Sequence, residues 1–328
     1  MSAPLRLGFQ THVHGTAPAR ELLPGLVDLF VAAEELGFDS GWVAQHHLGD
    51  DAGRLPSPLV LLGAAAEATR SLRLGTTVVV LPLENPLRLA EDAAVVDALS
   101  GGRLELGLGA GAYSRHEFAA FGRDPERRRE LYRDHLRRLI ELLGGDGLPP
   151  GLALSPGGAD ILSRIWEAPS RPDRAAEAAR AGHGLLLGVG APAEQRAIAD
   201  AYLAAAGDAE PRIGAFRGAF PGRSRDERAA ALGPDVARFG EQLAERTGVR
   251  LDVHGLLTAL LVHYGTPAEI LDSVRADLSL PVATDYVFAV QAASTSIADA
   301  IRTLEVIAAD IRPALTDDTL AHSERRTS

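Results

Sequence analysis

Four histidines stand close behind two short apolar runs near the start of the chain. His12 and His14 follow the run LRLGFQ, and His46 and His47 follow the run GWVA. A histidine can act as a base or a hydrogen-bond partner near neutral pH, and it can also ligate a metal. A His-x-His pair after the first strand of a barrel is typical of metal-dependent amidohydrolases, so the sequence has to be tested for the other ligands of such a site.

Those other ligands are missing. The chain contains no lysine that could be carbamylated to bridge two metals. His183 comes before its apolar run and Asp285 opens another, so both would lie at the end of a strand opposite to His12 and His14. The sequence therefore predicts no metal site, and it favours polar residues at the mouth of a cleft for His12 and His14.

The glycine-rich run GLGAG, residues 107–111, has two interpretations. It resembles a dinucleotide fingerprint, but no clean helix and no clearly placed acidic partner follow it, as that fingerprint requires. Glycines at the end of a strand let a flat ring approach the backbone closely, which would suit a flavin. They could equally serve a tight turn alone, and the sequence leaves both interpretations open.

A second candidate is the segment Ser170-Arg171-Pro172-Asp173-Arg174, which opens a predicted helix. Free backbone N–H groups, the Ser170 hydroxyl and two guanidinium groups would converge there and form a seat for a phosphate. The alternative is that Ser170 and Asp173 cap the helix while Arg171 and Arg174 extend into solvent.

The composition excludes several classes of function. The 328 residues carry a formal net charge of −11, have no Cys, and include no Lys, so that all 33 basic residues are Arg. A disulfide framework, a thiol nucleophile, a Schiff base and a Walker-A phosphate site are therefore excluded. Nucleic acid is an unsuitable partner for so acidic a chain. No segment resembles a signal peptide or a membrane span, and we expect a cytoplasmic protein.

The elements that must position these residues alternate regularly. Eight apolar runs, each followed by a segment of helical periodicity, predict an α/β fold consisting of a single closed (β/α)8 TIM barrel over residues 1–313, with a polar tail over 314–328. The eight predicted strands cover residues 5–10, 41–44, 72–81, 103–111, 164–168, 184–189, 212–220 and 285–290. Among the predicted helices, one runs from about Pro24 to Leu36, one begins at Asn85-Pro86, a helical region after residue 220 continues through residue 263, and one begins with a capping box at Thr266 to Glu269. In such a barrel the chemistry lies at the carboxyl ends of the strands, where the candidate residues fall.

Three segments carry a resemblance to a known family: ELGFDSGWVAQHH (35–47), LRLGTTVVVLPLENPLRLAEDAAVVDALSGGRLELGLGAGAY (72–113) and YGTPAEI (264–270). With them the chain resembles the bacterial luciferase-like flavin monooxygenases. The resemblance implies that reduced FMN, supplied by a separate reductase, reacts with O2 and oxidises a small organic substrate through a C4a-hydroperoxyflavin. It also implies a homodimer. A deazaflavin-dependent hydride-transfer enzyme and a non-catalytic luciferase-like subunit remain alternatives.

The resemblance also implies roles for individual residues. His46 would be the catalytic base, with Gln45 replacing an acidic neighbour. A non-proline cis peptide at Thr77-Val78 would support the flavin ring, and Tyr113 would lie beside the flavin tail. The seat at Ser170, Arg171 and Arg174 would hold the phosphate.

Two positions depart from the luciferase pattern. Ala110 stands where the luciferase catalytic subunit has an arginine that grips the phosphate, and Gly109 stands where it has a cysteine. Arg171 and Arg174 would then have to supply the missing charge, or phosphate binding would be weaker or lost.

Overall fold

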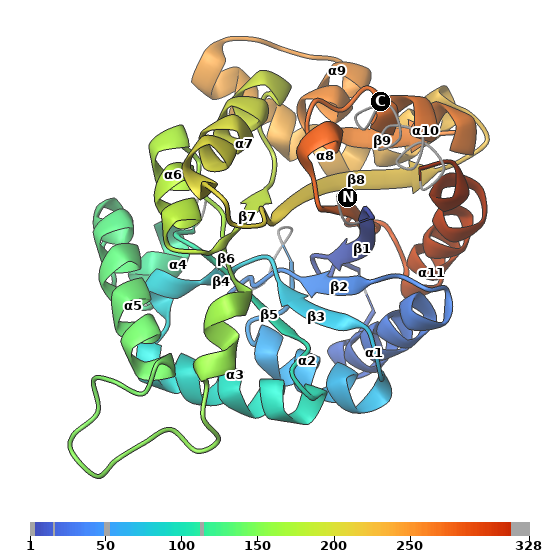
Figure 1. The fold of residues 1–328 in the computed structure, drawn as a ribbon. Helices are drawn as coiled ribbons and strands as arrows, with labels where there is room; N and C mark the ends of the chain where they lie inside the picture. Colours follow the sequence, from blue (N-terminus) through green and yellow to red (C-terminus); the bar gives the residue numbers. More distant parts are fainter. Residues whose placement is uncertain (1–3, 16, 49–52, 112–114, 316–328) are drawn as a thin grey trace.

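The computed structural model describes residues 4–15, 17–48, 53–111 and 115–315. Its strands are all parallel, and they close on themselves because the first strand pairs with the last and the last pairs with β8 (Figure 1). The strands are β1 (Arg6–Thr11), β2 (Ser40–Val43), β3 (Arg73–Thr76), β4 (Val79–Val80), β5 (Leu104–Gly109), β6 (Ile165–Glu167), β7 (Gly184–Leu187), β8 (Ile213–Pro221), β9 (Val262–Gly265) and β10 (Asp285–Ala289). The predicted barrel of eight strand positions is confirmed, with β4 continuing β3 and β9 added outside the closed ring.

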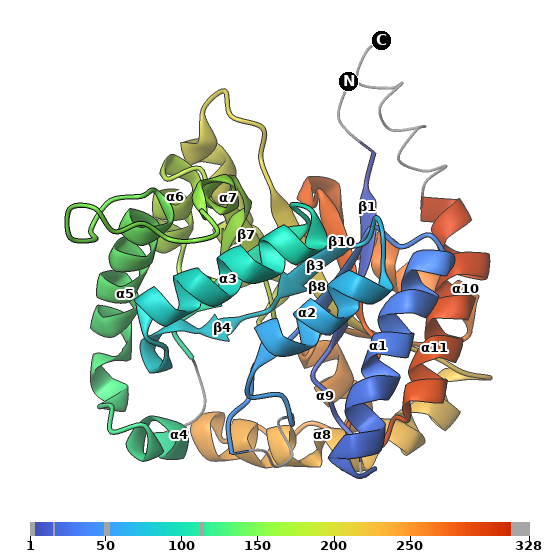
Figure 2. The same ribbon diagram turned by 90° about the horizontal axis from the view of Figure 1, so that it is seen from below.

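Helices surround the barrel, as Figures 1 and 2 show from two directions. They are α1 (Ala19–Glu35), α2 (Pro58–Ala68), α3 (Pro86–Ser100), α4 (Arg115–Ala120), α5 (Arg128–Leu143), α6 (Pro172–Arg180), α7 (Pro192–Ala206), α8 (Arg225–Thr247), α9 (Val253–Ala259), α10 (Pro267–Arg275) and α11 (Ile297–Val306). Two of the helix starts are those that the sequence predicts: Asn85 caps α3, and Thr266 with Glu269 forms a capping box on α10. In Figure 2, α4 and α8 lie at the end of the barrel toward which β1 runs.

The barrel interior is filled by a cluster of large side chains. Trp42 packs edge-on against Trp166 and Phe216, with ring centroids 5.7 and 5.4 Å apart. Gly75 makes room for the Trp42 indole, because a Cβ at this position would lie 2.0 Å from it. The partly buried Val78 packs against this cluster. The barrel is therefore a packed core, and its chemistry is confined to the rim.

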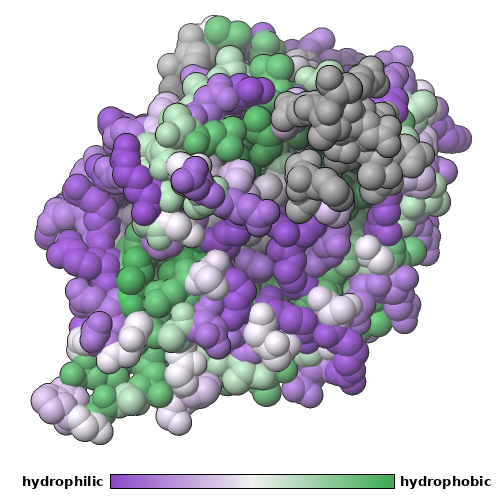
Figure 3. Space-filling model, viewed as in Figure 1, coloured by the Kyte–Doolittle hydropathy of each residue, from purple (hydrophilic) through white to green (hydrophobic). Residues whose placement is uncertain are grey.

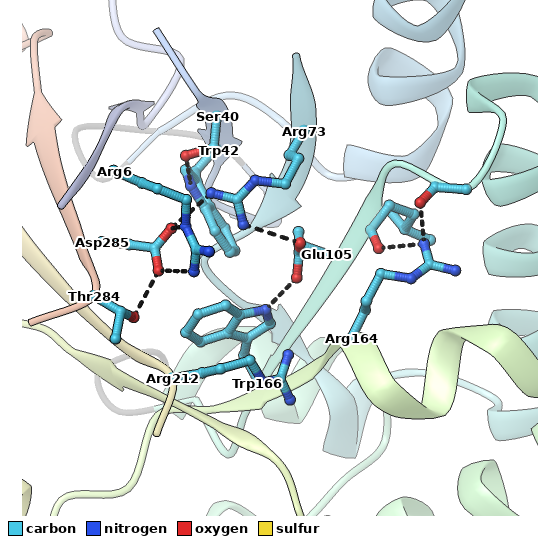
Figure 4. Close-up of polar contacts among 12 residues, drawn as sticks. Arg6, Ser40, Trp42, Arg73, Glu105, Arg164, Trp166, Arg212, Thr284 and Asp285 are labelled. Carbon is cyan, nitrogen blue, oxygen red and sulfur yellow. Dashed lines mark hydrogen bonds and ion pairs between the residues drawn. The ribbon is translucent and has the colours of Figure 1, made fainter. Parts of the chain in front are cut away.

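The amino end of the barrel is closed by charged residues. The Asp285 carboxylate accepts hydrogen bonds from Arg6 at 2.7 and 3.0 Å and from Arg73 at 2.7 Å, and Arg73 also donates to Glu105 at 3.1 Å (Figure 4). Trp166 donates its ring N–H to the same Glu105 at 2.6 Å. Figure 3 looks onto this end and shows hydrophilic residues over its centre. A ring of ion pairs thus ties β1, β3, β5 and β10 together.

Several segments differ from the sequence prediction. Helix α1 begins at Ala19, five residues before the predicted Pro24, which lies inside the helix and lacks only its own N–H donor. Strand β9 falls in a stretch where we expected helix, and it pairs with the carboxyl end of β8. Leu315, placed in the polar tail by the sequence, is buried in the core, while residues 316–328 lie outside the described residues. None of the helices described is both long and apolar enough to span a membrane.

Candidate functional site at the carboxyl rim of the barrel

His46 lies just beyond the end of β2 and is half-buried. Its backbone N–H donates to the carbonyl of Leu55 at 3.0 Å, and the N–H of the preceding residue, Gln45, donates to the carbonyl of Val78 at 3.4 Å. The main chain is therefore fixed at His46 and beside it. This is the rim position that the sequence predicts for a catalytic residue.

The Thr77-Val78 peptide bond is cis, as the resemblance led us to expect. It interrupts the apolar run and separates β3 from β4. The Thr77 N–H donates to the carbonyl of Val43 at 2.8 Å, which holds this segment against the end of β2. Thr77, Val78 and His46 thus belong to one continuous stretch of the rim.

Gln45, which replaces the acidic residue of the family pattern, is buried and fully engaged. Its side-chain carbonyl accepts from the Val80 N–H at 2.7 Å, and its amide donates to the Glu84 carboxylate at 2.7 Å and to the Pro56 carbonyl at 3.0 Å. An uncharged side chain that both donates and accepts is needed here. Gln45 therefore fixes β4 and the loop beyond His46.

Gly109 is the last residue of β5, and Ala110 follows it. A Cβ on Gly109 would lie 2.4 Å from a methyl carbon of Val78, so only glycine allows β5 to come this close to the cis peptide. This close contact explains why the third residue of GLGAG, Gly109, is a glycine. Tyr113 lies outside the described residues.

The histidines after β1 and β2 meet, although they are 34 residues apart. His12 Nδ1 lies 3.2 Å from His46 Nε2, and the His14 ring stacks on His12 with centroids 5.6 Å apart. Burial, together with repulsion from His46 and His14, lowers the pKa of His12 to about 3. His12 is therefore neutral at physiological pH. Within the described ranges, no group of three or more His, Asp or Glu side chains could hold a metal ion.

A groove of about 550 Å³ runs between α5 and α6, and Ala110 at the end of β5 contributes to its wall. All three residues of the predicted phosphate seat line it: Ser170, Arg171 and Arg174. The structure therefore brings Ala110 and the predicted phosphate seat to one groove.

The two predicted arginines are engaged with acidic residues of their own helix. Arg171 donates to the Asp173 carboxylate at 2.9 and 3.2 Å, and Arg174 pairs with Glu177. Neither Ser170 nor Asp173 caps the helix, because the N-cap position belongs to Arg171 and no side chain accepts there. The capping alternative is wrong in this respect. Exposed ion pairs of this kind contribute only about 0–1 kcal/mol, so a phosphate could draw these arginines away at little cost.

Sequence reasoning missed part of this site. Arg129, Arg133 and Arg137 of α5 line the groove opposite the predicted arginines. Their spacing of four residues places them on one face of a helix, and this signal could have found them. Gln10, the last residue of the first apolar run, was also missed, and it contacts both Thr77 and His12.

The comparisons with known proteins identify the family of this chain. Residues 7–279 match the family model described as luciferase-like monooxygenase, and the chain belongs to that family. It is 35% identical over 212 residues to protein y4wF of Sinorhizobium fredii, which is uncharacterized, and this match covers 61% of each chain. It is 38% identical over 112 residues to the alkanal monooxygenase alpha chain of the Kryptophanaron alfredi symbiont, covering 34% of this chain and 31% of the relative. The matches thus span about three fifths of y4wF and about a third of the alkanal monooxygenase alpha chain.

Solved structures share the fold over nearly the whole chain. Monooxygenase RslO1 from Streptomyces bottropensis superimposes with a TM-score of 0.81 at 23% identity, covering 94% of this chain and 99% of that one. The oxygenating constituent of 3,6-diketocamphane monooxygenase of Pseudomonas putida, solved with FMN, gives 0.75 at 17% identity, with 95% and 98% covered. The coenzyme F420 dependent tetrahydromethanopterin reductase of Methanopyrus kandleri gives 0.67 at 18% identity, with 95% and 100% covered.

Proposed function

We propose that this protein is a flavin-dependent monooxygenase that uses reduced FMN and O2 to oxidise a small organic substrate, with the reduced flavin supplied by a separate reductase. One observation carries the proposal. His46, the Thr77-Val78 cis peptide and Gly109 form one stretch of the rim, and Ala110 continues it into a groove lined by arginines.

The residues present fit a flavin. Thr77, Val78 and Gly109 would lie against its ring system, and the groove would receive its phosphate, with Ser170, Arg171 and Arg174 on one wall and the arginines of α5 on the other. Bound flavin would supply the electrons and the reaction with O2. The chain's own contribution is to orient the flavin, to exclude water, and to hold or move a proton at His46.

A titration with cofactors distinguishes the proposed FMN enzyme from the two alternatives. Purified protein is mixed with oxidised and reduced FMN and with a deazaflavin such as coenzyme F420, and binding is followed by flavin fluorescence. We expect FMN to bind in the micromolar range or below. Preference for F420 would favour the hydride-transfer enzyme, and failure to bind either cofactor at high micromolar concentration would favour a non-catalytic barrel.

The groove predicts a phosphate-dependent effect. The double variant Arg171→Ala/Arg174→Ala should raise the Kd for FMN about tenfold, which corresponds to about 1.4 kcal/mol. Its Kd for riboflavin, which lacks the phosphate, should not change. Arg127→Ala removes an exposed arginine that pairs with Glu130 at 2.8 Å and does not line the groove, and it serves as the control. An equal loss of affinity for both flavins would contradict a phosphate seat here.

The homodimer is proposed on the exposed apolar side chains of two neighbouring helices. Val60 of α2 is 76% exposed, and Val95 and Leu99 of α3 are 44% and 48% exposed. Figure 2 shows α2 and α3 side by side on the barrel surface. Val60→Glu/Leu99→Glu should convert a dimer to single chains in sedimentation velocity, whereas Leu152→Glu, in a loop elsewhere, should not. A native protein that sediments as one chain would refute the dimer.

A further inference from the structure

Gln10, His12, His46 and Thr77 form a hydrogen-bonded chain at the rim, which we call the rim chain. The Gln10 amide nitrogen donates to Thr77 Oγ1 at 2.8 Å and lies 3.4 Å from His12 Nε2. The other ring nitrogen of His12, Nδ1, lies 3.2 Å from His46 Nε2. The rim chain therefore connects the cis peptide with the proposed catalytic histidine through two side chains.

The direction of each hydrogen bond follows from the donors available. The amide nitrogen of Gln10 can only donate, so His12 Nε2 is an acceptor and carries no proton. A neutral imidazole has one ring proton, and in His12 it is therefore on Nδ1. This N–H donates to His46 Nε2, which leaves the proton of a neutral His46 on its own Nδ1.

The surroundings keep this arrangement in one state. Gln10 is only 6% exposed and is held by Thr77, so its amide is not free to exchange partners with water. The pKa of His12, about 3, keeps that ring neutral throughout the physiological range. The His14 ring stacks on His12 with centroids 5.6 Å apart, and repulsion from His14 is one of the causes of this low pKa.

The geometry assigns a new role to His12: it is a positioning residue that fixes the tautomer of His46, with Gln10 setting the polarity of the rim chain. His46 then carries its one ring proton on Nδ1. Its Nε2 is occupied by His12. The catalytic meaning of this assignment rests on the proposed function, but the tautomer itself does not.

The tautomer can be measured directly on the protein without substrate or flavin. In protein labelled with 15N-histidine, ring nitrogens with and without a proton have distinct chemical shifts, and the His46 signals are identified by their loss in His46→Gln. We expect the unaltered protein to show a protonated Nδ1 and an unprotonated Nε2 at His46. In His12→Phe, His46 Nε2 loses the donor that His12 provides, and we expect a mixture of both His46 tautomers.

Gln10→Glu provides the stronger test, because it reverses the rim chain without changing its shape. A carboxylate can only accept a hydrogen bond, so it would favour the His12 tautomer with the proton on Nε2. His12 Nδ1 would then carry no proton and act as an acceptor. His46 would then donate from Nε2, and the shifts of its two ring nitrogens should exchange. Gln195→Glu, at another buried glutamine on α7, is the matched control and should leave the His46 signals unchanged.

Two results would overturn the assignment: a protonated Nε2 at His46 in the unaltered protein, or an unchanged His46 tautomer in folded Gln10→Glu. The intrinsic fluorescence of Trp42 and Trp166, which pack inside the barrel, reports whether each variant is folded. Flavin binding is measured on the same samples. A protein with the expected tautomer that binds no flavin would refute the proposed function alone.

Discussion

Replacing His46 with alanine is expected to lower the rate of substrate oxidation at least about 100-fold, because proton transfer by a positioned side chain contributes about 10²- to 10⁴-fold. The affinity for FMN should change little, since the phosphate and the ring are held by other residues in the proposed complex. His46 combines three properties of such a group: it stands at the carboxyl end of β2, it is half-buried, and its Nε2 is held by His12.

The measurement is the product formed in single turnovers with chemically reduced FMN and O2. The substrate is the one that a panel of aldehydes, ketones and aromatic compounds identifies for the unaltered protein. His46→Gln keeps a polar side chain that cannot carry the proton, and it should be as slow as His46→Ala. His116→Ala removes an exposed histidine of α4 and should react normally. A normal rate for His46→Ala would show that the flavin needs no proton from this residue.

Much of the barrel could be predicted because each strand is a short apolar run with its own turn signals. Strand β9 could not, because only tertiary pairing with Gly218–Pro221 of β8 makes it a strand. Its sequence, VHYG, has no regular apolar pattern and follows a helix directly. The early start of α1 was missed for a similar reason, since Pro24 suggested a first turn and packing places it inside the helix.

The candidate site, like the fold, could be predicted from the sequence only in part. The position of His46 follows from its place after a strand, and this is a property of the local sequence. Its contact with His12 depends on the register between β1 and β2, which pairs Thr11 with Val43 and which no local pattern specifies. The groove likewise lies between α5 and α6. A role for the arginines of α5 at this groove can therefore be recognised only from the packing of the two helices.

The amino end of the barrel gives the largest expected effect on stability. Asp285 is 1% exposed and accepts hydrogen bonds from both Arg6 and Arg73 (Figure 4). Burial alone would raise the pKa of Asp285, but the hydrogen bond from Arg6 and the charge of Arg73 hold this pKa below its usual value. Removing the carboxylate would leave two guanidinium groups facing each other across the closed end of the barrel.

Asp285→Ala should therefore lower the free energy of unfolding by about 3 kcal/mol, the lower end of the range for breaking a buried pair, because the Arg6 side chain is 36% exposed. Urea unfolding followed by Trp fluorescence measures this loss. Asp200→Ala, which breaks an exposed pair with Arg196, should cost less than about 1 kcal/mol.

The stability that Asp285 provides should also depend on pH, because its pKa is lower in the folded protein than in the unfolded chain. This stabilisation is complete above the unfolded pKa of about 3.9 and is lost as the pH falls through the folded pKa. The stabilities of the native protein and of Asp285→Asn should thus converge in acid, and convergence toward neutral pH instead would show that the ion pairs do not provide this stability.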